Sequence, residues 1–219
     1  MAGLREAKKA QTRRALVGAA LELFGEHGYE RTTVAEIAEQ AGVSPATFFN
    51  YFATKEDVVF ADQHLYDEIL REVFAAADGT EPIAEFVPRT VRALATAPAW
   101  SFPLDDPLTA VRARLIASVP ALRAGFLLRN AVFADSWARA LCETYPGVLT
   151  EATAATLTGA VMGALQGGFG AYSGGEPLAD VVTRAAEYVV AGFPLSSSDS
   201  PSRRSSRRNR SAGNRPRNS

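Results

Sequence analysis

Helix start and stop signals follow one another closely between residues 16 and 52. Apolar side chains first recur at the i, i+3, i+4, i+7 spacing of one helical face, at Leu16, Ala19, Ala20, Leu23 and Phe24. Gly28 then stands where a helix of this pattern would stop. Thr33 with Glu36 three residues later is the sequence of a capping box, and Gly42 ends the short segment that it opens. The pattern therefore predicts two consecutive helices, the second of them short.

A third short helix is predicted directly after this glycine. Ser44 can cap its N-terminus, and Pro45 suits its first turn. Two short helices joined by a tight, glycine-containing turn form a helix-turn-helix, whose second helix enters the major groove of DNA. The side of this helix that packs inward is expected to comprise Val43, Phe48 and Phe52. The opposite side, free to meet DNA, is expected to comprise Pro45, Ala46, Phe49 and Asn50.

The segment from residue 12 to about residue 60 resembles the DNA-binding domain of the TetR (tetracycline-repressor) family. The residues that carry the match are Ala20, Leu21, Leu23, Phe24, Gly28, Tyr29, Thr32, Thr33, Val34, Ile37, Ala38, Ala41, Gly42, Val43, Ser44, Thr47, Phe48, Phe49, Tyr51, Phe52, Lys55, Glu56 and Asp57. The resemblance implies an all-α fold, with an N-terminal three-helix helix-turn-helix DNA-binding domain and a C-terminal helical ligand-binding and dimerisation domain. It also implies a homodimeric transcriptional regulator, with repression as the default, and not an enzyme.

The family's DNA-contacting positions can be carried over to this chain. They are Thr33, Ser44, Pro45, Ala46, Thr47, Phe49, Asn50, Tyr51 and Lys55. Thr33 and Lys55 are expected on phosphates, whereas Ala46 and the methyl group of Thr47 can touch thymine methyl groups. Phe49 stands where the family often has Tyr, so a hydroxyl contact to phosphate is lost. The recognition helix itself carries no Arg or Lys, so the salt dependence of binding is expected to be modest.

Charge is distributed unevenly, although the formal net charge is only −1. Residues 1–14 carry five Lys and Arg against one Glu, a net of +4, and residues 196–219 carry seven Arg against one Asp, a net of +6. The segment 15–195 therefore holds −11. A basic head on an acidic body indicates a localised contact with a polyanion. The head residues expected to reach phosphates or the minor groove are Lys8, Lys9, Arg13 and Arg14. The alternative is that helical surfaces simply carry mixed charge.

Helical periodicity continues through most of the chain, with no convincing period-two strand pattern. Helices are expected near 55–77, 82–97, 105–118, 120–145, 150–173 and 177–193, with a loop at 98–107. After Pro194 the composition is dominated by Ser, Arg, Asn and Pro, which cannot bury enough apolar surface to fold. We therefore expect a DNA-binding domain at 1–55, a ligand-binding and dimerisation domain at 56–195, and a disordered tail at 196–219.

Small residues recur every fourth position in one of these helices, at Ala155, Gly159, Gly163, Gly167 and Ala171. Such a row lets another helix approach closely. In the family the last two helices usually form a four-helix dimer interface, which implies a homodimer through 150–173 and 177–193. Packing of the same row within one chain is the alternative. A dimer would place two recognition helices on half-sites about 34–36 Å apart, so the operator should be a pseudo-palindrome.

Aromatic and apolar residues between the domains exceed what a plain helical bundle requires. Those expected to line a pocket for a small, largely apolar effector are Trp100, Phe102, Phe126, Phe133, Trp137 and Met162, with Arg129, Asn130 and Gln166 to orient it. The segment 112–140 also resembles, more weakly, a branch of the family that senses acyl-CoA-like effectors. Plain core packing of these residues is the alternative. Arg112 and Arg114 can likewise pair with Asp105 or Asp106 instead of a ligand anion.

Other classes of protein find little support in the sequence. Cys142 is the only cysteine and there are two histidines, so neither an internal disulfide nor a structural zinc site is expected. No signal peptide or membrane span is expected, and a cytoplasmic setting fits. No nucleophile–base pair or phosphate-binding glycine loop indicates an enzyme, and no cofactor is expected. Two alternatives stay open: a sensor or partner-binding module that has lost DNA binding, and nucleic-acid binding through the Arg-rich tail.

Overall fold

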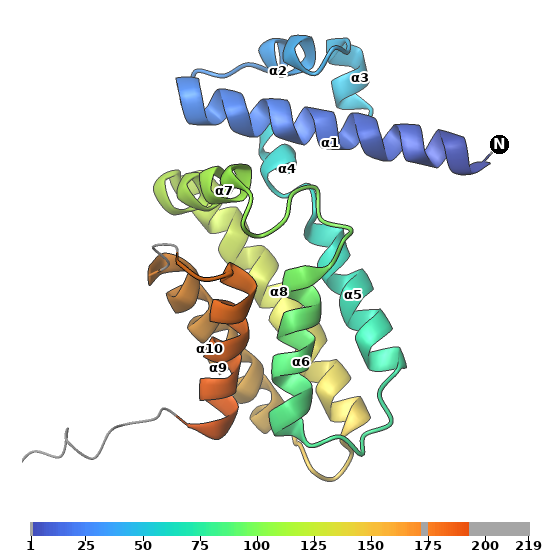
Figure 1. The fold of residues 1–219 in the computed structure, drawn as a ribbon, viewed down its shortest axis with the longest axis vertical. Helices are drawn as coiled ribbons and strands as arrows, with labels where there is room; N and C mark the ends of the chain where they lie inside the picture. Colours follow the sequence, from blue (N-terminus) through green and yellow to red (C-terminus); the bar gives the residue numbers. More distant parts are fainter. Residues whose placement is uncertain (1, 172–174, 193–219) are drawn as a thin grey trace, which may run out of the picture.

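The computed structural model describes residues 2–171 and 175–192, which form ten helices and no strand. The helices are α1 (Ala2–His27), α2 (Val34–Gln40), α3 (Pro45–Phe49), α4 (Lys55–Val59), α5 (Gln63–Ala75), α6 (Ile83–Thr96), α7 (Pro107–Ser118), α8 (Pro120–Thr144), α9 (Glu151–Ala171) and α10 (Leu178–Ala191). Figure 1 shows α1 lying across the top of a bundle made by α5 to α10, with α2 and α3 above it. The expected all-α fold is confirmed, whereas the tail 196–219 lies outside the described residues.

The three N-terminal helices share one apolar core because α1 buries the side that its periodicity predicts. Leu16 and Phe24 of α1 are buried against Ile37 of α2 and against Phe48 and Phe52. Full burial of one such side chain stabilises a fold by about 1.5–3 kcal/mol. Because Phe48 of α3 is part of this core, the packing also fixes the orientation of α3 relative to α1.

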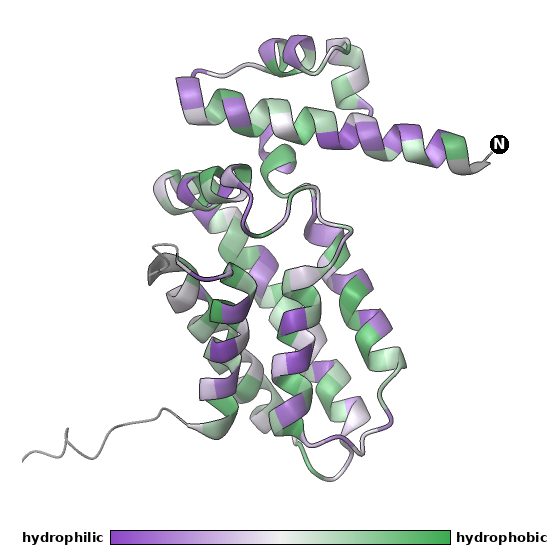
Figure 2. Ribbon diagram, in the orientation of Figure 1, coloured by the Kyte–Doolittle hydropathy of each residue, from purple (hydrophilic) through white to green (hydrophobic). Residues whose placement is uncertain are grey.

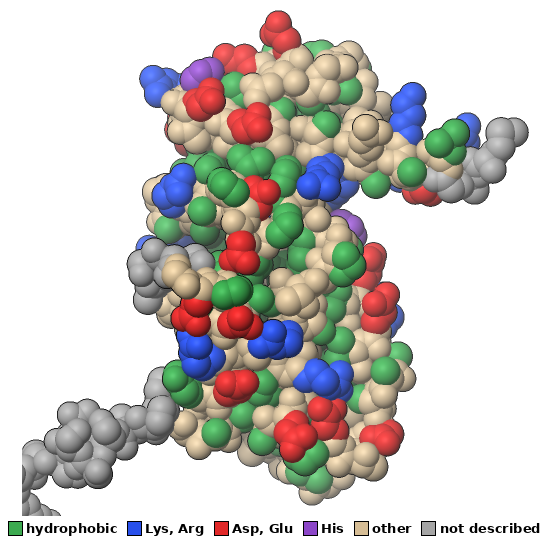
Figure 3. Space-filling view, viewed as in Figure 1, with side chains coloured by type: hydrophobic (Ala, Val, Ile, Leu, Met, Phe, Trp, Pro, Cys, Tyr) green, Lys and Arg blue, Asp and Glu red, His purple; other side chains and the backbone are tan. Residues whose placement is uncertain are grey.

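The bundle below has its own core around Trp137 of α8, which is fully buried together with Phe86 and Leu141. α10 packs against both α6 and α9, and α8 packs against α9. Figure 2 shows hydrophilic and hydrophobic residues alternating along α6 and α10, as expected for helices with one buried side. The outer sides carry ion pairs, such as Arg89–Glu81 and Arg92–Asp180, and Figure 3 shows both charges interspersed there.

The N-terminal helices and the bundle are in direct contact. Leu115 of α7 and Leu122 of α8 are buried in the same cluster as the α1 side chains. A Cβ added at Gly18 of α1 would lie 3.3 Å from the ring of Phe102, and one at Gly25 would lie 3.5 Å from Val111 of α7. A side chain at Gly18 would require Phe102 to shift by a few tenths of an ångström, whereas one at Gly25 would make an ordinary van der Waals contact with Val111.

The single helix expected over 55–77 is in fact two, because residues 60–62 interrupt it. The carbonyl oxygen of Ala61 accepts a hydrogen bond from Arg13, and the carboxylate of Asp62 is bonded to the loop between α6 and α7. These tertiary contacts hold a turn that local periodicity does not reveal. The remaining expected helices correspond to α6 through α10, and the expected loop ends where α7 begins.

Candidate DNA-binding surface and effector pocket

Helix α3 is short, but an N-terminal cap and one buried side hold it in place. The hydroxyl oxygen of Ser44 accepts the Thr47 N–H at 3.1 Å, and Pro45 occupies the first turn. Phe48 is fully buried, and its ring centre lies 5.7 Å from that of Phe52. Because this side is held in the core, the opposite side of α3 is presented to solvent in a defined orientation.

That outward side gathers most of the residues expected to meet DNA. The exposed ones are Ser44, Pro45, Ala46, Phe49 and Asn50, and the half-buried ones are Thr47 and Tyr51. Phe49 exposes 56% of its surface, and its ring centre lies 5.5 Å from that of the buried Phe48. The side carries short apolar groups, a hydroxyl and an amide but no charge. Such a surface suits thymine methyl groups and base edges of a major groove.

Thr33 is exposed, but its polar groups are already bonded within α2. Its N–H and its hydroxyl donate to Glu36 Oε2 at 2.7 and 2.8 Å, which closes the expected capping box. These bonds, the backbone one first, lower the pKa of Glu36 below its usual value. A phosphate approaching Thr33 would therefore have to compete with a carboxylate.

The half-buried side chain of Lys55 is hydrogen-bonded to the turn between α1 and α2. Its ammonium donates to the carbonyl oxygens of Tyr29 at 2.9 Å, Thr32 at 3.4 Å and Glu30 at 3.5 Å. It also lies 4.4 Å from the centre of the Tyr29 ring. The ammonium that the family resemblance places on a phosphate is therefore bonded, in this structure, to carbonyl oxygens of the turn between α1 and α2.

Substituting Lys55 by Ala is expected to lower the free energy of unfolding by about 1–2 kcal/mol, because three carbonyl oxygens lose a charged donor. Urea denaturation followed by circular dichroism measures the change. Lys9→Ala, at an exposed position of α1, is the control and should unfold like the parent. Unchanged stability combined with weaker DNA binding would instead assign the ammonium to a phosphate.

The basic head is divided between internal contacts and free charges. Arg13 donates to the Ala61 carbonyl and lies over the Phe52 ring, and Arg14 lies 5.3 Å from the Phe102 ring centre. These two arginines link α1 to the segments on either side of α4 and to the loop before α7. The exposed charges of this segment are Arg5, Lys8 and Lys9. Figure 3 shows Lys and Arg side chains toward the outer end of α1.

Four aromatic rings form a continuous column inside the bundle. Tyr66 of α5 joins the column, with its ring centre 4.8 Å from that of Trp100 and 5.2 Å from that of Phe133. Phe133 in turn lies 6.0 Å from Trp137. Trp100 donates to the Leu94 carbonyl at 2.7 Å, whereas the buried indole N–H of Trp137 has no partner among the described residues. Three of the expected pocket residues are therefore brought together by a tyrosine that sequence reasoning missed.

Of the other expected pocket residues, Met162 packs against the core that contains Phe133 and Trp137, whereas Phe102 and Arg129 lie outside it. Phe102 packs on α1, and Arg129 lies over the Phe60 ring and 4.0 Å from Asp57, at the joint between α4 and α8. Gln166 is exposed on α9. The remaining three, all half-buried, are Phe126, Asn130 and Met162. Arg129 and Phe102 thus hold the two parts of the molecule together, which their sequence positions alone do not reveal.

A buried polar cluster lies at the top of this column. Asp62 accepts from the Ser101 hydroxyl at 2.5 Å and from Arg112 at 3.1 Å. The expected alternative partners of Arg112 are otherwise engaged: Asp106 caps α7 and Asp105 accepts the Leu178 N–H. Arg112 therefore pairs with a more distant carboxylate than those considered from sequence.

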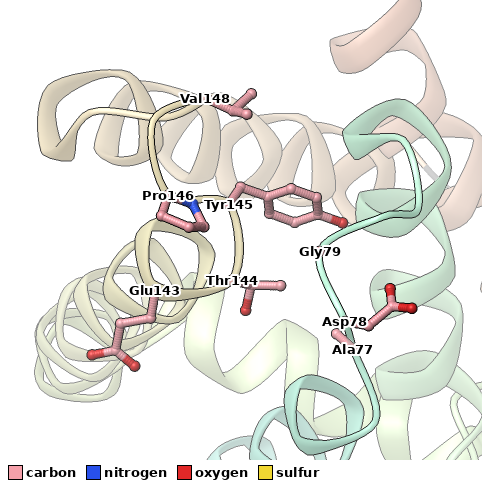
Figure 4. A pocket seen from close by; sticks show the side chains of 8 residues that line it. All are labelled: Ala77, Asp78, Gly79, Glu143, Thr144, Tyr145, Pro146 and Val148. Atoms are coloured by element: carbon pink, nitrogen blue, oxygen red, sulfur yellow. The ribbon is translucent and has the colours of Figure 1, made fainter.

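Two surface hollows over the described residues of the bundle bear on the position of a ligand pocket. One, of about 540 Å³, lies at the far end between the α5–α6 and α8–α9 loops, and Figure 4 shows Tyr145 directed toward Gly79 there. It contains none of the expected pocket residues. The other, of about 150 Å³, adjoins the aromatic column and is lined by Ala95, Thr96, Ala97, Pro98, Trp100 and Pro103. Of these two hollows, the second shares a lining residue, Trp100, with the column.

The row of small residues on α9 is left uncovered. A Cβ added at Gly159, Gly163 or Gly167 would meet no described atom within 4 Å, and Ala155 is exposed. Gly168, one position on, faces α10 instead. Packing within the chain therefore does not account for the row over the described residues.

Metal ligands and membrane-spanning helices can be assessed over residues 2–171 and 175–192. No group of three or more His, Cys, Asp or Glu side chains is arranged to hold a metal ion in these ranges. No single helix among them is long and apolar enough to cross a bilayer, and α7 with α8 pass together by length and composition but are bent by 101°.

Helices α2 and α3 are short and are joined by a turn that contains Gly42. One side of α3 is buried in the core and the other is exposed to solvent. These features define a helix-turn-helix DNA-binding protein. Residues 16–61 match the model of "Bacterial regulatory proteins, tetR family", and residues 81–194 match that of the MftR C-terminal domain. The chain belongs to the TetR family of regulators. That is a class of regulatory proteins and not of enzymes, in agreement with the sequence-based expectation.

Similar proteins point the same way. The regulator TcmR of Streptomyces glaucescens is 46% identical over 83 residues, which are 38% of this chain and 35% of TcmR. The chain thus spans about a third of the length of the curated relatives it matches. A TetR-family regulator from Mesorhizobium loti has a TM-score of 0.58 at 21% identity, over 83% of this chain and 94% of that one. Thermus thermophilus FadR, in complex with lauroyl-CoA, has a TM-score of 0.53 at 21% identity, over 86% and 98%.

Proposed function

We propose that this chain is a homodimeric transcriptional repressor that leaves a pseudo-palindromic operator when a small, largely apolar effector enters its bundle. The observation that carries the proposal is the outward side of α3, where Pro45, Ala46 and Asn50 are exposed above a buried Phe48. The match of residues 16–61, which include α3, to the tetR-family model of bacterial regulatory proteins supports the same use of this side. We therefore favour DNA binding over a sensor or partner-binding role. Such a regulator works beside the chromosome, in the cytoplasm.

The uncovered row on α9 supports dimerisation through α9 and α10. A second copy could approach the backbone closely at Gly159 and Gly163. Exposed apolar side chains on the neighbouring α8, Leu128 and Val132, extend the same kind of surface. Two copies related by a two-fold axis would then offer two α3 helices to successive major grooves, about 34–36 Å apart.

The effector is proposed to act through the aromatic column. Trp100, Tyr66 and Phe133 provide an apolar lining, and the hollow beside Trp100 provides a point of entry. An effector shifts the dimer off DNA only if it binds the released form more tightly than the DNA-bound form. The complex of T. thermophilus FadR with lauroyl-CoA supports an acyl-chain effector as one starting point for a search.

An electrophoretic mobility shift with the DNA upstream of the chain's own coding sequence tests the proposal. We expect a shift at low salt, a footprint with two-fold symmetry, and release by an apolar effector. The salt dependence should be modest, because α3 is uncharged. Removal of residues 196–219 is expected to leave sequence specificity intact. A protein that shifts no duplex at low salt would contradict the proposed function.

A further inference from the structure

The guanidinium group of Arg112 is buried but only partly paired. Arg112 lies on α7, and its side chain exposes 15% of its surface. One nitrogen, Nη1, donates to Asp62 Oδ2 at 3.1 Å. The other two nitrogens, Nε and Nη2, are buried and have no hydrogen-bond partner among the described residues. Buried charged donors without partners are costly, so this arrangement favours a form in which an acceptor is supplied.

The unpaired nitrogens are the pair best suited to a carboxylate. Nε and Nη2 lie on one edge of the planar guanidinium, and their two N–H bonds are parallel and match the two oxygens of a carboxylate. Asp62 cannot serve this edge as it stands. Its Oδ1 accepts from the Ser101 hydroxyl, and its Oδ2 accepts from Nη1 and from the Ser101 N–H at 3.4 Å.

The aromatic column begins near the guanidinium group, at Tyr66. Tyr66 is close enough to Arg112 and Asp62 for both charges to act on it, and burial raises the pKa of its hydroxyl. Its ring contacts Trp100 and Phe133, the start of the aromatic column. A ligand held by the guanidinium would therefore have an anionic end among charged groups and an apolar part among rings.

We propose that Arg112 recognises the carboxylate of an amphipathic effector, a free organic acid with an apolar chain. This inference rests on the proposed function, since it names the class of effector for the same bundle. The ligand carboxylate would share the guanidinium group with Asp62, and Asp62 lies at the break between α4 and α5. Ser101, its other partner, precedes Phe102, whose ring lies 3.3 Å from the Cβ position of Gly18 in α1. The effector head thereby acts on the contact between the bundle and the DNA-binding helices.

Tryptophan fluorescence of the full-length dimer, free of DNA, tests the proposal, because Trp100 and Trp137 both lie in the column. The probes are straight-chain fatty acids from octanoate to dodecanoate, below their micellar range, with the alcohols of equal length. We expect the best carboxylate to bind about tenfold or more tightly than its alcohol. Dodecanoyl-CoA is a third probe, since its anionic groups are phosphates and its acyl carbonyl is a thioester.

Two variants of opposite expected sign make the test specific. Arg112→Gln should weaken binding of the carboxylate about tenfold or more and leave the alcohol nearly unaffected. Asp62→Asn should strengthen carboxylate binding, because the side chain at position 62 would no longer carry a negative charge that repels the ligand. Arg114→Gln, an exposed arginine on the same helix, is the control and should behave like the parent. If Arg112→Gln unfolds, the double variant Asp62→Asn/Arg112→Gln replaces the ion pair by two amides and should lose the preference for carboxylates.

Several results would overturn the inference. The first two are equal affinity for acid and alcohol, and no binding of any acid. The third is that Asp62→Asn weakens acid binding, as Arg112→Gln is expected to do. The last is that only the binding of dodecanoyl-CoA depends on Arg112. The last would assign the guanidinium to a phosphate. Operator binding by the unliganded parent is measured separately. Its failure would contradict the proposed function, whereas the fluorescence titration tests the carboxylate site by itself.

Discussion

Replacing Ala46 by Glu is expected to weaken operator binding about 100-fold or more, which corresponds to about 3 kcal/mol. Ala46 is exposed on the outward side of α3, so a carboxylate there would lie among phosphates and base edges without entering the core. Because each dimer carries the substitution twice, the repulsion acts at both half-sites. Fluorescence anisotropy of a labelled operator at fixed salt measures the loss.

Ala84→Glu is the matched control for this substitution. Ala84 is also exposed, and it lies in the first turn of α6, where a carboxylate suits the helix dipole. The control adds the same side chain far from α3, so its operator binding should equal that of the parent. Thermal unfolding of both variants should be close to that of the parent. Normal operator affinity of Ala46→Glu would exclude α3 as the helix that enters the groove.

Gly163→Leu is expected to separate the dimer and to reduce affinity for a two-half-site operator about 100-fold or more, because one copy then binds without the help of the other. A single chain has room for the leucine, since no described atom lies within 4 Å of a Cβ at this position. Across a two-fold axis, however, the two added side chains would keep the helices apart. Sedimentation velocity reports the mass of the particle in solution.

The control for this change is Ala84→Leu, which adds the same side chain to an exposed helical position on α6. It should remain a dimer and bind the operator normally. Circular dichroism should show that both variants keep their helices. If Gly163→Leu dimerises as tightly as the parent, the interface lies elsewhere and the row on α9 has another role.

The N-terminal helices were predictable because their signals are local. Thr33 and Glu36 are three residues apart, and in the structure they close the box that this spacing predicts. Ser44 likewise caps α3. The short period of α3 also predicted that Phe48 would be buried while Phe49 would be exposed. A pattern confined to one helical turn contains all the information that these features require.

The polar contacts could not be predicted, because they join residues far apart in the sequence. Lys55 bonds to a carbonyl 26 residues earlier, and Arg112 pairs with Asp62 across 50 residues. Arg112 has nearer carboxylates, which made a local ion pair the obvious expectation. Tyr66 gave no signal of its own role either, since a tyrosine among the apolar residues of α5 has the pattern of ordinary core.

The mixed cluster of α1, α7 and α8 residues has a consequence for how this regulator can be taken apart. Leu115 and Leu122 are buried in the same apolar cluster as Leu16 and Phe24, so the core of the first sixty residues is completed by side chains of the bundle. Expressed without the bundle, these residues would expose apolar side chains that are normally buried and would tend to aggregate. Grafting this head onto a foreign sensor would accordingly require transplanting the underside of α7 with it, as one inseparable unit.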